Sequence, residues 1–94
     1  MRRAAKVDDN QGDVVEALRK CGCSVSSTAA VGNGFPDIVV GVAGRNYLLE
    51  IKDGSKIPSK RQLTRDEKKF RDGWSGQVAT VNSPDEALRV VGLL

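Results

Sequence analysis

The sequence contains no histidine, and this absence restricts the chemistry open to the protein. Hydrolytic mechanisms that need a histidine base are excluded, which leaves metal-bound water and lysine as the means of activation. The two cysteines, Cys21 and Cys23, stand one residue apart without a second pair, so a four-ligand zinc site is also excluded. We expect both to be reduced thiols with a structural role.

Aromatic residues and long apolar segments are scarce as well. One Trp, one Tyr and two Phe argue against a surface that binds single strands by stacking many bases. No apolar run reaches the about 18 residues that span a bilayer, and acidic residues rather than an apolar signal core follow the basic start. We therefore expect a cytoplasmic protein without a membrane partner, in which residues 1–7 form a flexible basic arm.

Helix and strand signals alternate along the chain, and they predict three helices and four strands. Asp9 or Asn10 is expected to cap the first helix. Thr64 and Glu67 are expected to form a capping box at the start of the second helix, with Phe70 and Trp74 on its inner face. The expected elements are helix 10–21, strands 24–28, 34–40 and 47–52, helix 64–74, strand 77–81 and a helix from residue 84. At 94 residues the chain can form one core but not two. The order αβββαβα predicts one α/β domain, residues 1–94, with a mixed central sheet covered on both faces.

Three ionisable residues, Asp37, Glu50 and Lys52, interrupt two of the apolar strand segments. A turn near Gly44 and Arg45 would join these segments as a hairpin, with Asp37 opposite the stretch from Glu50 to Lys52. Side chains alternate with period two, so the three would share one face and the apolar residues the other. Opposed side chains start about 5 Å apart, so both carboxylates can reach one Mg²⁺ or Mn²⁺ ion. The alternative is an ion pair in which the acids merely anchor Lys52.

Basic residues are concentrated directly after this hairpin. Seven of the fifteen Lys and Arg residues lie in residues 56–71, where a phosphate backbone would be attracted. The alternative is a solvated surface, because Asp66 and Glu67 within the stretch and Asp72 directly after it partly neutralise the charge. The residues that we expect to contact nucleic acid are Ser55, Lys56, Lys60, Arg61 and Arg65.

These motifs resemble those of a nuclease family. Pro36-Asp37 and, after a gap of twelve residues, Glu50-Ile51-Lys52 resemble the P-D…(D/E)-x-K signature of the restriction-endonuclease-like, PD-(D/E)XK superfamily. From about residue 8 onward the chain resembles a compact, phage-type VRR-NUC domain. The segments that carry this resemblance are residues 9–11, 31–37, 48–56, 63–64 and 81–88.

The resemblance implies a three-layer α/β/α core of the restriction-endonuclease-like kind and a DNA endonuclease that depends on Mg²⁺ or Mn²⁺. In that family the acids that match Asp37 and Glu50, with the backbone carbonyl at Ile51, hold the metal, and the lysine that matches Lys52 is catalytic. Relatives often add a helix glutamate, and the matching position here is Gln11, which could hold the metal through a water. Glu16 could replace it only if the helix is rotated.

The family also implies a preference for branched DNA, as in Holliday-junction resolvases, a homodimer, and a phage or prophage origin. No organic cofactor is expected. Two other functions stay open, namely a non-cleaving nucleic-acid binder on the same fold, which the absence of the helix carboxylate favours, and a structural or regulatory protein.

Overall fold

The computed structural model describes residues 10–94, so the expected basic arm and Asp9 lie outside the described residues. The elements are α1 (Gln11–Lys20), β1 (Ser24–Ser27), β2 (Ile38–Val42), β3 (Arg45–Ile51), the 3₁₀ helix η1 (Pro58–Lys60), α2 (Arg65–Gly73), β4 (Val78–Val81) and α3 (Pro84–Val90). Apart from η1, this is the predicted order of helices and strands.

The strands form one mixed sheet in the order β1-β2-β3-β4, in which β4 is parallel to β3 and the other neighbours are antiparallel. The β2–β3 hairpin turns at Ala43 and Gly44, whose φ angles are 52° and 77°. The turn predicted near Gly44 and Arg45 was therefore wrong by one residue, because Gly44 takes the second rather than the first of two positions that need positive φ. Ile38 pairs with Leu49.

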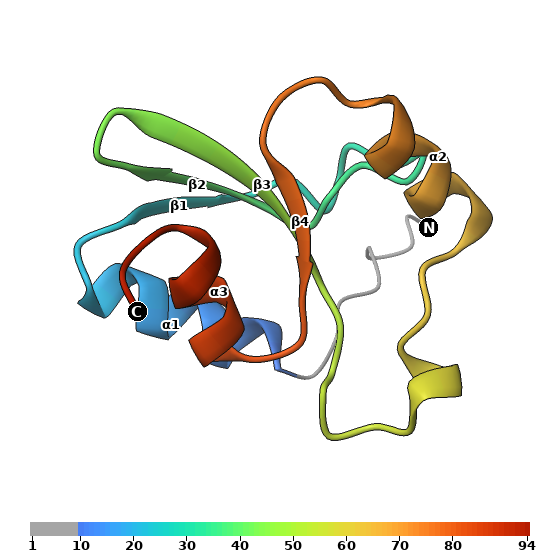
Figure 1. Ribbon diagram of the computed structural model, residues 1–94, viewed down its shortest axis with the longest axis horizontal. Coiled ribbons are helices and arrows are strands. Elements are labelled where there is room, and N and C mark those ends of the chain that lie inside the picture. Colours follow the sequence, from blue (N-terminus) through green and yellow to red (C-terminus); the bar gives the residue numbers. More distant parts are fainter. Residues whose placement is uncertain (1–9) are drawn as a thin grey trace, which may run out of the picture.

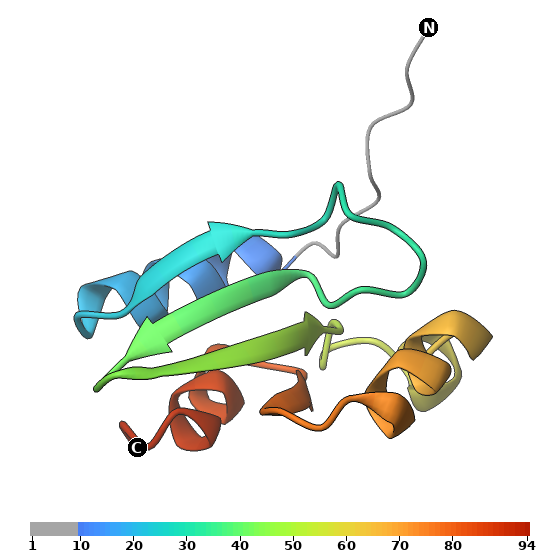
Figure 2. The same ribbon diagram turned by 90° about the horizontal axis from the view of Figure 1, so that it is seen from above.

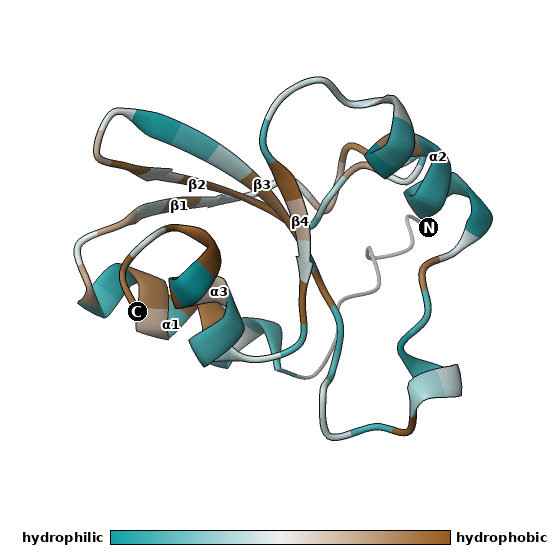
Figure 3. Cartoon of the chain, viewed as in Figure 1, coloured by the Kyte–Doolittle hydropathy of each residue, from teal (hydrophilic) through white to brown (hydrophobic). Residues whose placement is uncertain are grey.

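Helices α1 and α3 lie side by side on one face of the sheet, as Figures 1 and 2 show. The apolar sides of both helices meet the apolar face of the strands, which is visible as the brown interior in Figure 3. The buried apolar side chains of this core are Val14, Leu18, Cys23, Ile38, Val40, Leu49, Ile51, Val81, Ala87 and Val91. Cys21 is exposed, and both thiols are free, as expected.

Helix α2 lies beyond the ends of β2 and β3, beside the loop that precedes β2 (Figure 2). Phe35 in that loop meets Phe70 of α2 edge to face, with ring centroids 4.9 Å apart. Gly34 touches the backbone of α2 so closely that a Cβ there would overlap the carbonyl group of Asp66. The α/β class and the mixed sheet are thus confirmed, whereas coverage of the second sheet face stays a prediction.

No helix within residues 10–94 is long and apolar enough to cross a membrane.

Candidate active site

Asp37 and Glu50 lie opposite each other where β2 begins and β3 ends. The ladder continues beyond the Ile38 and Leu49 pair, since the Asp37 N–H donates to the Leu49 carbonyl at 3.0 Å. Asp37 Oδ2 in turn accepts a 2.7 Å hydrogen bond from the Ile51 N–H, which fixes its carboxylate against β3. The shared face of the two acids is therefore confirmed, and Asp37 lies opposite Glu50, the first residue of the stretch that was expected to face it.

Both carboxyl groups lie in surroundings that disfavour their charged forms. Glu50 is only 6% exposed, and burial, followed by the negative charge of Asp37, raises its pKa to about 9. Burial also raises the pKa of Asp37, although the hydrogen bond from Ile51 acts in the opposite direction. A divalent cation between the two acids would reverse this effect, because it stabilises the carboxylate form of each.

Lys52 reaches the same place from the residue after β3. Its Nζ lies 3.6 Å from Glu50 Oε2 and 2.9 Å from Glu67 Oε1, and its side chain is 13% exposed. Asp37, Glu50 and Lys52 therefore converge as the sequence predicts. The ion pair that the structural alternative requires is present as well, so these contacts fit both interpretations of Lys52.

Glu67 is the member of the site that the sequence analysis missed. It belongs to a capping box, in which the Thr64 N–H donates to Glu67 Oε1 at 2.9 Å and the Glu67 N–H donates to Thr64 Oγ1 at 3.2 Å. Burial alone raises the pKa of Glu67, but the Thr64 N–H and the Lys52 ammonium outweigh it and lower the pKa. The capping box was visible in the sequence, yet nothing local indicated that this turn of α2 faces the strand ends.

One pocket brings these groups together. Its lining consists of Asp37, Glu50, Ile51, Lys52, Lys60, Thr64 and Glu67. Among residues 10–94, no three carboxylate, thiol or imidazole side chains are grouped so as to enclose a metal ion by themselves. The donor set nevertheless fits Mg²⁺, which usually takes one or two carboxylates and completes its coordination with water and substrate phosphate.

The two further metal-ligand candidates on α1 have different positions. Asn10 donates through Nδ2 to the carbonyls of Lys52 and Asn82, at 3.0 and 3.2 Å, and so ties the start of α1 to the end of β3. Gln11 follows it and does not line the pocket of Asp37 and Glu50, but its Oε1 is buried without a hydrogen-bond partner among the described residues. Glu16 instead forms an exposed ion pair with Lys20 at 3.7 Å and does not line the pocket.

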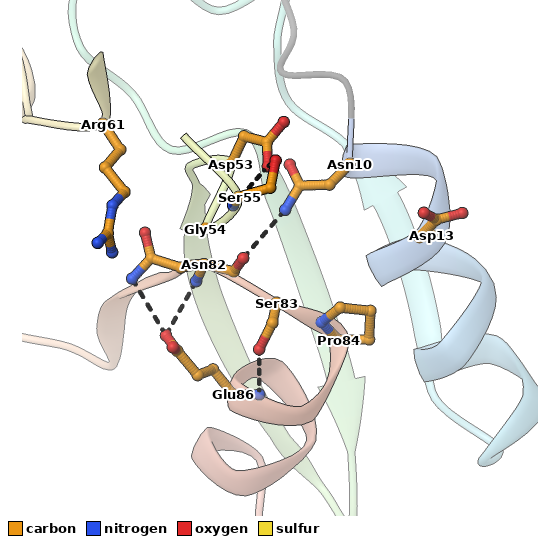
Figure 4. Close-up of a pocket in the computed structure, with 10 residues that line it drawn as sticks. All are labelled: Asn10, Asp13, Asp53, Gly54, Ser55, Arg61, Asn82, Ser83, Pro84 and Glu86. Carbon is orange, nitrogen blue, oxygen red and sulfur yellow. Dashed lines mark hydrogen bonds between the residues drawn. The ribbon is translucent and has the colours of Figure 1, made fainter. Parts of the chain in front are cut away.

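The expected nucleic-acid contacts are divided between two places. Lys60 lines the pocket of Asp37 and Glu50. Ser55 and Arg61 line a second pocket, beside Asn10 and Asn82 (Figure 4). The Ser55 hydroxyl there donates to Asp53 Oδ1 at 2.7 Å, so its hydrogen atom is already engaged within the chain.

The other two expected contacts, Lys56 and Arg65, are exposed to solvent. Lys56 stands in the loop before η1, and Arg65 is the first residue of α2, two positions before Glu67. Of the five expected contacts, the structure therefore places Lys60 alone in the lining of the pocket of Asp37 and Glu50.

No family model, curated protein or solved structure matches the chain. The resemblance to VRR-NUC nucleases consequently rests on the motifs alone, and the function has to be argued from the geometry of the site.

Proposed function

We propose that the protein is a divalent-metal-dependent DNA endonuclease that hydrolyses phosphodiester bonds. The observation that carries this proposal is the convergence of Asp37, Glu50 and Lys52 in one pocket, with the pKa of both acids raised by burial. Burying two acids side by side costs stability unless they bind a cation. An arrangement that weakens the folded protein and yet suits Mg²⁺ is typical of a functional site.

Each group has a distinct task in this proposal. Asp37 and Glu50, with the backbone carbonyl of Ile51, would hold Mg²⁺ or Mn²⁺. When bound, the ion would polarise the scissile phosphate and lower the pKa of a water molecule. Lys52 would stabilise the negative charge that develops on the phosphate or orient the attacking water. Its contact with Glu67, at 2.9 Å, holds the ammonium at the pocket.

The surroundings of the pocket favour a nucleic-acid substrate. Lys60 lies within the lining, and Arg65 stands exposed on the first turn of the helix that supplies Glu67. Gln11 would add an amide oxygen rather than a charge, and because it lies outside the pocket lining, a water molecule would have to connect its buried, unpartnered Oε1 to the metal. With the motif resemblance, this supports the fuller proposal of a three-layer restriction-endonuclease-like fold, a phage or prophage origin, and a homodimer that cuts branched DNA such as Holliday junctions.

A second function, a nucleic-acid binder that does not cut, has its own supporting observation. Gln11 stands where relatives often have a glutamate, so the site has one negative charge fewer with which to hold a metal. In such a protein Lys52 and its carboxylates would form a structural ion pair beside a basic surface.

A cleavage panel separates these functions. Purified protein is incubated with labelled four-way junction, linear duplex and single strand, each with Mg²⁺, Mn²⁺ or EDTA. We expect cutting that needs the metal, favours the junction, and falls by about 100-fold or more in Asp37→Ala and Lys52→Ala. Glu16→Ala and Lys20→Ala serve as matched controls, because their charges form an exposed ion pair outside the pocket.

Three outcomes would contradict the proposal or part of it. Binding that needs no metal and leaves every strand intact identifies the non-cleaving binder. Equal cutting of all substrates contradicts the branched-DNA preference. A protein that neither binds nor cuts any substrate contradicts both functions, and a structural role for the acids remains.

A further inference from the structure

The few aromatic residues of the chain gather at one place. Three of the four, Phe35, Phe70 and Trp74, contact one another. The Phe70 and Trp74 rings stack with centroids 4.9 Å apart and an interplanar angle of 19°. Such a cluster ordinarily forms a small core, yet 44% of Trp74 is exposed. The expectation that Trp74 lies on the inner face of its helix is therefore only partly met.

A pocket opens against this exposed aromatic surface. Phe70 and Trp74 form its apolar wall, and Lys69, Asp66 and Asn33 also line it. A flat aromatic wall stacks well on a nucleobase, an ammonium attracts the phosphate, and carboxylate and amide groups match the polar edge of a base. An aliphatic peptide side chain would use the wall but leave these polar groups without a role.

This aromatic pocket adjoins the candidate active site. Glu67 belongs to the active-site lining, and Phe70 follows three residues later on α2, about 4.5 Å along the helix axis. The loop that carries Asp37 presses on the same helix at Gly34. Asp66, the residue before Glu67, lines the aromatic pocket, and Trp74 stands seven residues beyond Glu67, about 10 Å along the helix axis. A strand whose phosphate lies between Asp37 and Glu50 would therefore bring a nearby base to Trp74.

We propose that the aromatic pocket binds one unpaired nucleobase next to the scissile phosphate, with Trp74 as its stacking partner. This inference rests on the nucleic-acid binding part of the proposed function and narrows its substrate class. A single stacking position selects strands with unstacked bases, as in junctions and flaps, over continuous duplex. It also agrees with the low aromatic content, which excludes an extended stacking platform but not one position.

The first experiment uses the intrinsic fluorescence of Trp74, which is the only tryptophan of the chain. The full-length protein is titrated in EDTA with a single-stranded oligonucleotide and with the same oligonucleotide made entirely of abasic nucleotides. We expect the normal strand to quench the emission and the abasic strand to leave it unchanged. Because no divalent metal is present, the result does not depend on cleavage.

The second experiment measures affinity by the anisotropy of labelled strands. Trp74→Leu keeps an apolar side chain but cannot stack, and it should weaken binding of the normal strand by about 5- to 150-fold. Trp74→Phe, which keeps an aromatic ring, should retain most of the affinity. Neither variant should alter binding of the abasic strand. If Trp74→Leu fails to fold, the comparison of the two strands on the natural protein still decides the question.

The inference is overturned if both strands quench equally, if Trp74→Leu weakens both equally, or if no strand binds in EDTA. Its failure is distinguishable from failure of the nuclease proposal. If Trp74→Leu still cuts junctions with an unchanged KM, the stacking role alone is contradicted. If the quenching depends on the bases but no substrate is cut, the nuclease proposal alone is contradicted.

Discussion

Two neighbouring residues of β3 point to opposite faces of the sheet and are both buried, yet they contribute to stability in opposite ways. Leu49 and Glu50 are neighbours on β3, with exposures of 0% and 6%. Leu49 faces α1 and α3 among apolar side chains and adds to the free energy of unfolding. Glu50 faces another acid, and burial disfavours its charged form.

Under the proposed function, one face of the hairpin serves folding and the other serves chemistry. A hydrophobic residue at position 50 would bury apolar surface without any electrostatic cost, and that exchange is often neutral or stabilising. An apolar pair at these positions would therefore stabilise the fold at least as well as the two acids do. Their presence is best explained by a ligand, and a divalent cation is the ligand that suits them.

Substitution at adjacent residues tests this comparison most strongly. Leu49→Ala should lower the free energy of unfolding by about 2 to 5 kcal/mol, because it leaves a cavity in the core. Glu50→Gln should change stability at neutral pH by less than about 1 kcal/mol, because the carboxyl is already uncharged there. It should nevertheless reduce metal-dependent cleavage by about 100-fold or more. Urea unfolding and the junction assay measure the two effects, and a Glu50→Gln protein that unfolds as easily as Leu49→Ala would contradict the distinction.

A pair of glycines tests how the active-site loop is held against α2. Gly34 and Gly32 have nearly the same φ, 79° and 78°, but a Cβ at Gly34 meets the backbone of Asp66, whereas a Cβ at Gly32 meets nothing within 4 Å. Both alanine variants bear the strain of positive φ, and only Gly34→Ala adds a clash. Gly34→Ala should therefore be less stable than Gly32→Ala by about 1 to 3 kcal/mol. It should also lose cleavage, because the clash moves Glu67 away from Lys52.

The dependence of stability on pH tests the electrostatic cost directly. The pKa of Glu50 is about 9 in the folded protein against an ordinary 4.5, and that of Asp37 is also raised. The folded state then binds protons that the unfolded state has lost, so stability is highest at low pH and falls as the pH rises towards 9. We expect the metal-free protein to lose several kcal/mol, up to about 5, between pH 5 and pH 9.

Magnesium supplies the control for this pH effect. The ion binds the deprotonated acids, so it should raise Tm more at pH 9 than at pH 6. Glu50→Gln should flatten the pH dependence and remove most of the response to magnesium. A metal-free protein that gains stability from pH 5 to pH 9 would show that the acids are charged and paired, as the structural alternative requires.

The residues of the hairpin could be predicted because their relation is local and periodic. A turn at Gly44 and Arg45 would place Asp37 opposite Lys52, whereas the observed turn at Ala43 and Gly44 places it opposite Glu50. Moving the turn by one residue shifts the register by two, which leaves every side chain on its expected face. The face that carries the acids was therefore predicted correctly although the turn was not.

The contributions of α2 could not be predicted because they depend on contacts between distant segments. Glu67 was recognised as a cap, and Phe70 and Trp74 as a helical stripe, but the stripe does not say what it faces. The answer lies in Gly34 and Phe35, about thirty residues earlier, which fix α2 beyond the strand ends. Because α2 lies beyond the strand ends, the helix layer that was expected over the second sheet face stays a prediction.

Glu67 offers the smallest effect and the finest test of the comparison, because it serves both folding and the site. Glu67→Gln keeps an oxygen that can accept from the Thr64 N–H, so the cap should survive and stability should change by less than about 1 kcal/mol. The charge that holds Lys52 is lost, so kcat should fall by about 10-fold while KM stays the same, as expected for a positioning residue. Glu86→Gln is the matched control, because Glu86 occupies the equivalent position of α3 and accepts from the Asn82 N–H at 2.9 Å, and it lies outside the pocket of Asp37 and Glu50. If both variants cut DNA at the natural rate, the contact between Glu67 and Lys52 stabilises the fold without aiding cleavage. Asp37, Glu50 and Lys52 then act without support from α2.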